Sequence, residues 1–236
     1  MMTNIRRRLR TGAILAIGVL TAACTIGGPA GPTAREQKTI ERGAATQARV
    51  DVDMSAGDLF VTSGAVQLFE GDFEFNLPAL KPTVAYSVDG TTGVLKVSQG
   101  SASGNYENTW HLNLDEMTPV ELHITLGAGD AKLTLGKLNL QSVDVRLGAG
   151  DLDLDLRGMP AGSYPVSVNA GAGDTTLHLP ASAGISVRTL GLIGDTSVSG
   201  LEKRDDRWIN PRAAASPVTI DVRIQHAIGD LKLDAE

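Results

Sequence analysis

Cysteine is almost missing from this sequence, since Cys24 is the only one in 236 residues. A lone thiol has no partner within the chain, so an intramolecular disulfide framework is excluded. Aromatic residues are also scarce, at 4%. A core with so few large rings must be built from Val, Leu and Ile on closely spaced backbone, which favours regular strands.

No apolar run is long enough to cross a membrane, which requires about 20 residues. The uncharged run 12–23 is shorter, and it follows Arg6, Arg7, Arg8 and Arg10. A basic start followed by about 7–15 apolar residues is typical of a secretory signal peptide. We therefore expect residues 1–23 to be a signal peptide that is removed on export.

Cys24 stands directly behind that run. The stretch 20–24, Leu-Thr-Ala-Ala-Cys, resembles a bacterial lipobox, although Thr21 replaces the usual large aliphatic residue. An incidental buried thiol is the alternative, and the position of Cys24 favours lipidation. The resemblance implies two or three acyl chains, which would hold the protein on the outer side of the cell membrane, or on an outer membrane where one exists.

Composition divides the rest of the chain into two parts. Residues 24–45 begin with a Gly- and Pro-rich stretch and are expected to form a flexible tether, whereas residues 46–236 have the size of one domain. Removal of residues 1–23 takes away four arginines and no acid, so the formal charge falls from −6 to −10. Such a surface repels phosphate backbones, which excludes nucleic acid as an expected partner.

A four-residue phrase recurs along the domain. Its clear copies are Ser55–Asp58, Gly127–Asp130, Gly148–Asp151 and Gly171–Asp174, and its weaker copies are Leu192–Asp195 and Ala227–Asp230. From Gly129 onward, the spacings are 21, 23, 21 and 35 residues. A nearly fixed period of this size is typical of a solenoid, whose repeats bury their apolar faces against their neighbours.

Apolar residues alternate with polar ones on both sides of each phrase, as in 143–147 and 152–156. Alternation with a period of two predicts strands with one buried face, and places Val145, Val168, Val187 and Val222 inward. The alternation changes phase at Gly150-Asp151 and at the equivalent positions of other copies. A phase change at a fixed place indicates a bend, for which glycine provides the backbone freedom. The predicted fold class is therefore an all-β, β-helix-like solenoid of short strands joined by Gly-Asp bends.

Three segments depart from the regular repeat. Residues 70–75 resemble a degenerate bend, and Asp89-Gly90 predicts a hairpin. Residues 201–215 account for the longer last spacing and are expected to form a loop that leaves the solenoid.

The recurring aspartates have two interpretations. A carboxylate that follows a bend can accept a nearby backbone N–H and so cap its own bend, and this capping role is the expected one. The alternative is a cation site, because aligned carboxylates on rungs about 4.8 Å apart could recruit Ca²⁺. The positions concerned are Asp58, Asp130, Asp151, Asp174, Asp195 and Asp230.

Residues for catalysis are not apparent. No pair of histidines has metal-ligand spacing, and His123 and His178 lie on the outward parity of their strands. His226 lies on the inward parity near the last bend, and we expect it to cap the end of the stack and not to bind a metal. The many carboxylates leave a glycosidase pair open, and Phe60, Tyr106, Trp110 and Trp208 are aromatic rings that could contact a glycan. We expect no catalytic residue, metal or cofactor.

Several segments in order resemble the toast-rack family of bacterial envelope proteins. They are residues 73–76, 81–82, 108–114, 119–130 and 207–211, together with the repeated Gly-Asp phrases. The C-terminal part is also similar to the domain of the cell-wall-active-antibiotics response proteins. The resemblance spans residues 50–233 and implies a stacked β-solenoid in the cell envelope. Related proteins are described as proposed adhesins or stress-response components. No catalytic residues are attributed to the family, so the resemblance implies none here.

Two functions from different classes follow. The first is a non-catalytic, membrane-anchored envelope module that binds an envelope partner or takes part in the response to cell-wall stress. The second is a surface protein of adhesin type that binds polysaccharide, such as cell-wall glycan, or calcium.

Overall fold

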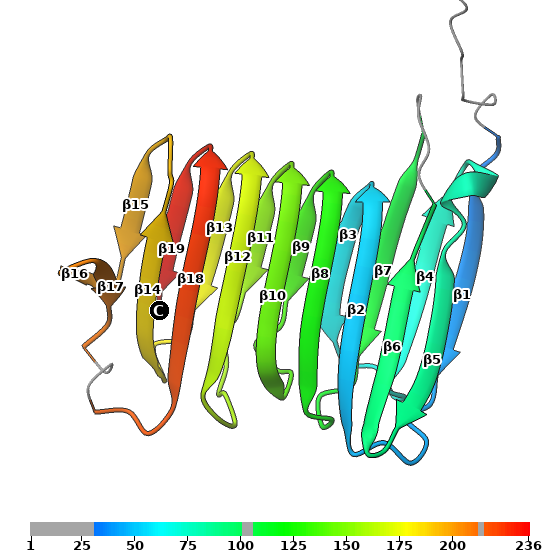
Figure 1. Cartoon of the computed structure of the whole chain (residues 1–236), viewed down its shortest axis with the longest axis horizontal. Coiled ribbons are helices and arrows are strands. Elements are labelled where there is room, and N and C mark those ends of the chain that lie inside the picture. The colour runs from blue at the N-terminus through cyan, green and yellow to red at the C-terminus, as the bar shows by residue number, and fades with distance from the viewer. Residues whose placement is uncertain (1–30, 101–105, 212–214) are drawn as a thin grey trace, which may run out of the picture.

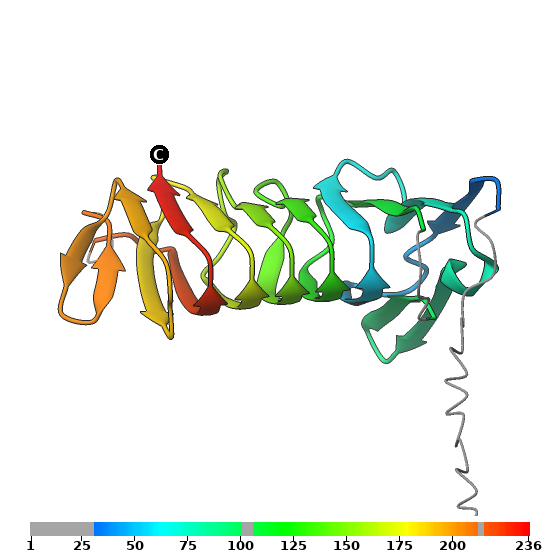
Figure 2. The ribbon, with the colours of Figure 1, turned by 90° about the horizontal axis from the view of Figure 1, so that it is seen from above.

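The computed structural model describes residues 31–100, 106–211 and 215–236. The expected signal peptide, residues 1–23, and Cys24 lie outside these ranges. The described chain forms a nine-stranded sheet, called sheet A, and a ten-stranded sheet, called sheet B. The two sheets pack face to face along one axis (Figures 1 and 2). Their inward side chains form a single core. The predicted β-solenoid is confirmed.

Six rungs form the regular part of the described chain. In each rung a strand of sheet B runs to a bend at one edge, the bend edge, and continues as a strand of sheet A. The rungs are β2 (Gln47–Ala56) with β3 (Asp58–Ser63), β8 (Val120–Ala128) with β9 (Ala131–Thr134), β10 (Leu140–Ala149) with β11 (Leu152–Asp155), β12 (Tyr164–Ala172) with β13 (Thr175–Leu179), β14 (Gly184–Leu190) with β15 (Thr196–Ser199), and β18 (Thr219–Ile228) with β19 (Leu231–Ala235). Neighbouring rungs pair in parallel, which aligns the repeated phrases side by side.

The rungs do not stack in the order of the sequence. The last rung, β18–β19, lies between β12–β13 and β14–β15, as the position of β18 in Figure 1 shows. The two weaker phrases, Leu192–Asp195 and Ala227–Asp230, are therefore neighbours in space, where Ile193 forms a parallel bridge with Ile228. Divergence from the repeat thus marks one end of the solenoid.

The buried faces agree with the predicted parity. Val145, Val168, Val187 and Val222 are each at most 1% exposed. They occupy two adjacent rows, because Val145 pairs with Val168 whereas Val187 pairs with Val222. Arg146, on the opposite parity, is exposed.

The N-terminal end is built differently from the repeat. Sheet A continues with β7 (Asn108–Leu114), β4 (Phe69–Phe75) and β1 (Ala34–Ile40), the last two antiparallel to their neighbours. Sheet B continues with β6 (Thr92–Ser98) and β5 (Thr83–Asp89), and a 3₁₀ turn, η1 (Pro78–Leu80), precedes β5. The predicted hairpin at Asp89-Gly90 joins β5 to β6 and is confirmed.

Two predictions fail at this end. Residues 70–75 are not a bend but part of the continuous strand β4, whose residues Phe69, Phe73 and Phe75 fill the core. The expected tether 24–45 is also too long, since 34–40 form β1. This strand carries little apolar alternation because it is an edge strand, partly fixed by ion pairs such as Glu36 with Lys38 and Lys81.

The expected loop 201–215 is in part ordered. Residues Glu202–Arg204 (β16) and Arg207–Ile209 (β17) form a hairpin that pairs with β14 and extends sheet B. Asn210 fixes the hairpin because its side chain accepts the N–H of Ile185 and donates to the carbonyl of Ala183. The hairpin therefore adds two strands to sheet B beyond β14, whereas the sequence predicted a loop that leaves the solenoid. In the described residues, no helix is long and apolar enough to span a membrane.

Candidate functional site

Close contact between backbones defines the bend edge. The third residue of each phrase is a glycine with φ between 121° and 152°, a region that side-chain-bearing residues rarely adopt. A Cβ on Gly150 would clash with the carbonyl oxygen of Gly129 in the next rung. Backbone hydrogen bonds continue through the bend, for example from the N–H of Gly150 to the carbonyl of Ala172. Glycine is thus required by both conformation and space.

The aspartate that follows the glycine bonds to the neighbouring rung. The carboxylate Oδ1 of Asp130 accepts the backbone N–H of Asp151 at 2.9 Å, and Asp151 accepts that of Asp174 at 2.8 Å. The ladder continues from Asp174 to Asp230 and from Asp230 to Asp195. Sequence reasoning placed the accepted N–H within the same bend. The difference arises because parallel stacking brings the next rung's N–H into line with the carboxylate.

This geometry predicts the effect of replacing Asp151. Asp151→Asn keeps an acceptor oxygen and should cost little, whereas Asp151→Ala removes the acceptor and should cost about 0.5–2 kcal/mol, as for other side-chain caps. Thermal unfolding with and without chelator checks the role of a cation. A ladder that only bonds to backbone gives no chelator response, whereas bound Ca²⁺ at a hundredfold excess over Kd would add about 2.7 kcal/mol, lost in Asp151→Asn.

A shallow groove of about 390 Å³ runs beside the ladder on the outer face of sheet A. Its floor includes Phe60, Lys132, Asp153 and Thr176. Phe60 stacks on His111 with ring centroids 4.6 Å apart, and Lys132 lies 3.5 Å from Asp153. The groove is therefore acidic along one side, with an aromatic ring at one end.

A second cluster on this face contains His178, Asp234 and Glu236. Each residue offers one possible metal-ligand atom, an imidazole nitrogen or a carboxylate oxygen. These three atoms all lie within 4.8 Å of one another. Arg157 approaches the cluster, since it donates to Glu236 at 2.5 Å and to Asp155. The Arg157 guanidinium also holds the pKa of the Asp155 carboxyl below its usual range.

Sequence reasoning placed His178 correctly on an outward face but missed its neighbours. His178 meets Asp234 because β13 pairs with β19, which is the rung inserted out of sequence order. A stack in sequence order would put β15 beside β13. The rung insertion therefore creates this cluster, and the spacing of 56 residues gives no sign of it.

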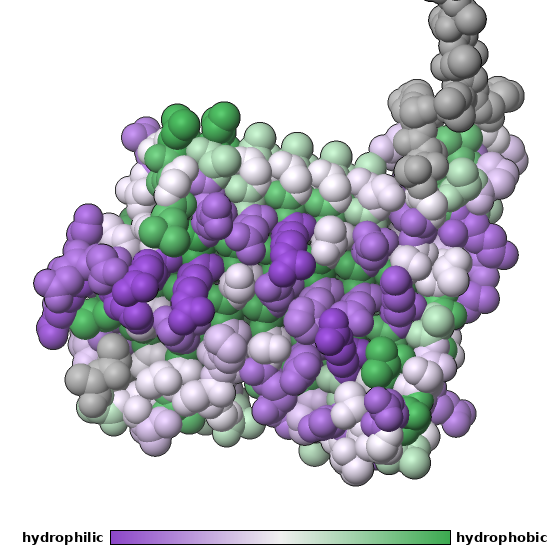
Figure 3. Space-filling model, viewed as in Figure 1, coloured by the Kyte–Doolittle hydropathy of each residue, from purple (hydrophilic) through white to green (hydrophobic). Residues whose placement is uncertain are grey.

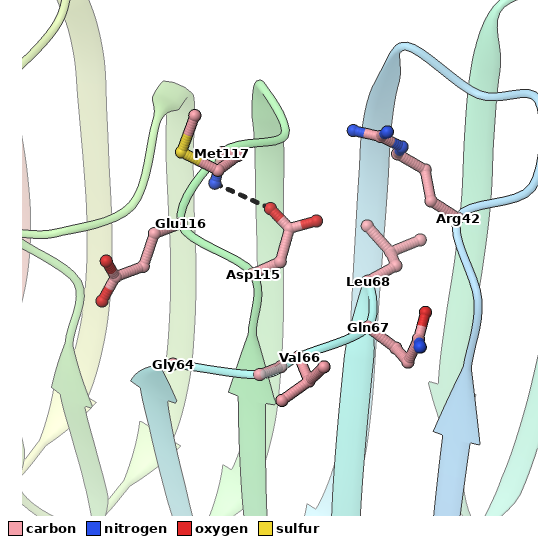
Figure 4. Close-up of a pocket in the computed structure, with 9 residues that line it drawn as sticks. Arg42, Gly64, Val66, Gln67, Leu68, Asp115, Glu116 and Met117 are labelled. Carbon is pink, nitrogen blue, oxygen red and sulfur yellow. Dashed lines mark hydrogen bonds between the residues drawn. The ribbon is translucent and has the colours of Figure 1, made fainter.

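A wider hollow lies at the opposite edge, between loops that follow strands of sheet A (Figure 4). It has a volume of about 560 Å³ and is lined by Arg42, Val66 and Met117, among others. Its polar groups bond to nearby groups of the same chain: Asp115 accepts the N–H of Met117 at 2.8 Å and Glu116 accepts the Ser63 hydroxyl at 3.0 Å. These bonds hold the loops together and leave the hollow open to solvent.

The remaining sequence candidates have packing roles. Trp110 is fully buried, packs edge-on against Phe73 and donates to Asn108. Tyr106 and Trp208 pack partly buried against the core. His226 is buried, with Nε2 2.8 Å from the carbonyl oxygen of Gly173. It does not cap the end of the stack, because its rung is internal.

Comparison with known proteins agrees with this architecture. Residues 29–178 match the family model described as the N-terminal domain of toast_rack. The crystal structure of a proposed cell adhesion protein from Clostridium sporogenes is 25% identical with a TM-score of 0.80, and the match covers 86% of this chain and all of the other.

More distant structures are also similar. A proposed adhesin from Bacteroides fragilis is 12% identical, with a TM-score of 0.33 over 87% of this chain and 98% of the other. A proposed lipid binding protein from Parabacteroides distasonis is 11% identical, with a TM-score of 0.31 over 89% and 96%. No curated protein matches the chain significantly in sequence. Because the family model matches more than half of the residues, the chain belongs to the toast-rack family.

Proposed function

We propose that this protein is a non-catalytic binding module of the cell envelope, anchored by lipid at Cys24 and displayed on the outer side of a membrane. The observation that carries the proposal is the architecture itself: a solenoid with open faces, similar along its length to a proposed cell adhesion protein. The groove beside the aspartate ladder and the hollow at the opposite edge are both open to solvent, whereas small-molecule sites usually bury most of their ligand in a concave pocket. An envelope protein or a cell-wall glycan is the proposed partner.

A second candidate is a cation-dependent surface protein. The cluster of His178, Asp234 and Glu236 favours this candidate, because imidazole and carboxylate are ligands for divalent transition metals. The ion pair between Arg157 and Glu236 opposes it, since a bound cation would have to displace or tolerate the guanidinium. Binding of an envelope partner on the outer faces of the sheets is therefore the better-supported function.

The anchor is tested by Cys24→Ala. We expect the variant to leave the membrane fraction or to accumulate as an uncleaved precursor, because acylation requires the thiol and supplies the binding energy. Cell fractionation with mass analysis of the N-terminus measures both. A processed variant that stays on the membrane would contradict the anchor.

The partner is tested by crosslinking in intact cells. Photo-reactive residues at Thr176, on sheet A, and at Arg223, on sheet B, probe the two outer faces separately. We expect a discrete crosslinked product from one of them. Turnover of envelope substrates by the purified protein would contradict the non-catalytic proposal.

A further inference from the structure

The bend edge ends in an exposed apolar corner. Leu190, Ile193 and Ile228 are 57%, 69% and 57% exposed. They lie together, because Ile193 bridges Ile228 and β14 ends at Leu190 beside β18. Figure 3 shows hydrophobic residues gathered where β14, β15 and β18 reach this edge. The other copies of the repeated phrase carry alanine where Ile193 and Ile228 stand. The bend itself therefore does not require a large apolar side chain at this position, and the exposed corner needs another explanation.

The chain enters the domain at this same edge. Ala34 pairs with Phe75, which pairs with Asn108, and the Asn108 carbonyl and side-chain amide lie against Gly57 of the first bend. The start of β1 is therefore level with the bends, and the direction of β1 in Figure 1 shows the same arrangement. Gly31 is the seventh residue after Cys24, so a lipidated Cys24 could lie at most about 25 Å from Gly31.

This short connection limits which side can meet the membrane. The opposite edge lies a further strand length away, about 23 Å for the seven residues of β1. To bring that edge to the lipid, the connection would have to run back along the domain at almost full extension. The bend edge can reach the lipid at little cost in chain entropy.

We propose that the bend edge faces the membrane and that Leu190, Ile193 and Ile228 insert into the lipid interface. The inference rests on the proposed lipid anchor. The tether holds the domain at the β1 end of the edge and the apolar corner holds it at the other end. The long axis of the solenoid then lies along the membrane, with the outer face of sheet A accessible.

Charge sets the tilt of the docked domain. The exposed aspartates Asp130, Asp151 and Asp174 lie on the sheet A side of the bends. On the sheet B side the edge is made of small residues, among them Gly171, Gly191 and Ala227. The domain therefore leans on its sheet B side, and docking is stronger on zwitterionic than on anionic lipid, because the carboxylates repel negative headgroups.

The lipidated full-length chain in phosphatidylcholine vesicles tests the proposal. Lipidation blocks the Cys24 thiol, so Ile193→Cys offers one site for an environment-sensitive fluorophore. Met159→Cys is the matched control, because Met159 is 90% exposed and lies between β11 and β12 on the opposite edge. Spin-labelled lipid should quench the probe at position 193 several-fold more than the probe at position 159.

Each other outcome overturns the proposal in a recognisable way. Equal quenching at the two positions in protein that floats with the vesicles would overturn docking and leave the anchor intact. Failure to float would overturn the anchor, and the docking with it. The probe at position 193 could instead show a blue-shifted emission that spin-labelled lipid does not quench and that grows with the density of protein on the vesicle. This result would show that the corner contacts a second copy of the chain and not the lipid.

Discussion

Replacing Val145 by Asp is expected to lower the free energy of unfolding by several kcal/mol, enough to unfold a domain of ordinary stability. Val145 is 1% exposed and pairs with Ile124 on one side and Val168 on the other. A carboxylate at this position would be buried between two rungs without a partner. Burial of an unpaired charge is among the few single changes with so large an effect.

Arg146→Ser is the matched control, because Arg146 is the next residue of β10 and points to solvent. Its ion pair with Asp144 lies on the surface and contributes about 0–1 kcal/mol. Chemical denaturation of both variants measures the difference. Similar losses of stability would show that the inward and outward faces of β10 are assigned wrongly.

Gly150→Ala is expected to have the second large effect, about 3 kcal/mol or more. The φ of Gly150 is 125°, and strained backbone of this kind costs about 1–3 kcal/mol for a residue with a side chain. The added methyl would also clash with the carbonyl oxygen of Gly129 in the neighbouring rung. This oxygen belongs to the backbone and cannot move aside as a flexible side chain could. The clash must be relieved by moving two rungs apart.

Two other glycines separate these causes. Gly64 has φ 110° with open space around it, so Gly64→Ala should show the conformational cost alone. Gly162 has neither a left-handed φ nor a close neighbour, and Gly162→Ala should be neutral or slightly stabilising. Melting temperatures should fall in the order Gly162→Ala, Gly64→Ala, Gly150→Ala. A loss for Gly150→Ala no larger than for Gly64→Ala would contradict the tight stacking of bends.

The regular part of the fold was predictable from local pattern. The alternation around Val145 and the phase change at Gly150 are consequences of strand geometry and of glycine's freedom, and both are visible in a single repeat. The ends were less predictable, because β1 is a polar edge strand whose stability comes from pairing with β4. The hairpin β16–β17 was missed for a similar reason, since its three-residue strands carry no clear alternation.

The candidate sites were harder to predict because they depend on which rungs are neighbours. The aspartate positions are evident from the repeat, but the acceptance of the next rung's N–H requires the parallel register. The cluster at His178 requires β19 to lie beside β13, and the apolar corner requires Ile228 to lie beside Ile193. A period in the sequence predicts that repeats stack, but it does not give their order.

The rung order is therefore the central claim, and crosslinking tests it directly. Ser167 on β12 pairs with Arg223 on β18, and Arg223 pairs with Arg188 on β14. In a Cys24→Ala background, Ser167→Cys with Arg223→Cys should form a disulfide readily, because paired Cα atoms lie about 5 Å apart. Ser167→Cys with Arg188→Cys should not, because two rung spacings, about 9.6 Å, exceed the limit for a disulfide of about 7 Å. Efficient oxidation of the second pair and not of the first would show that the rungs stack in sequence order and would contradict the structure.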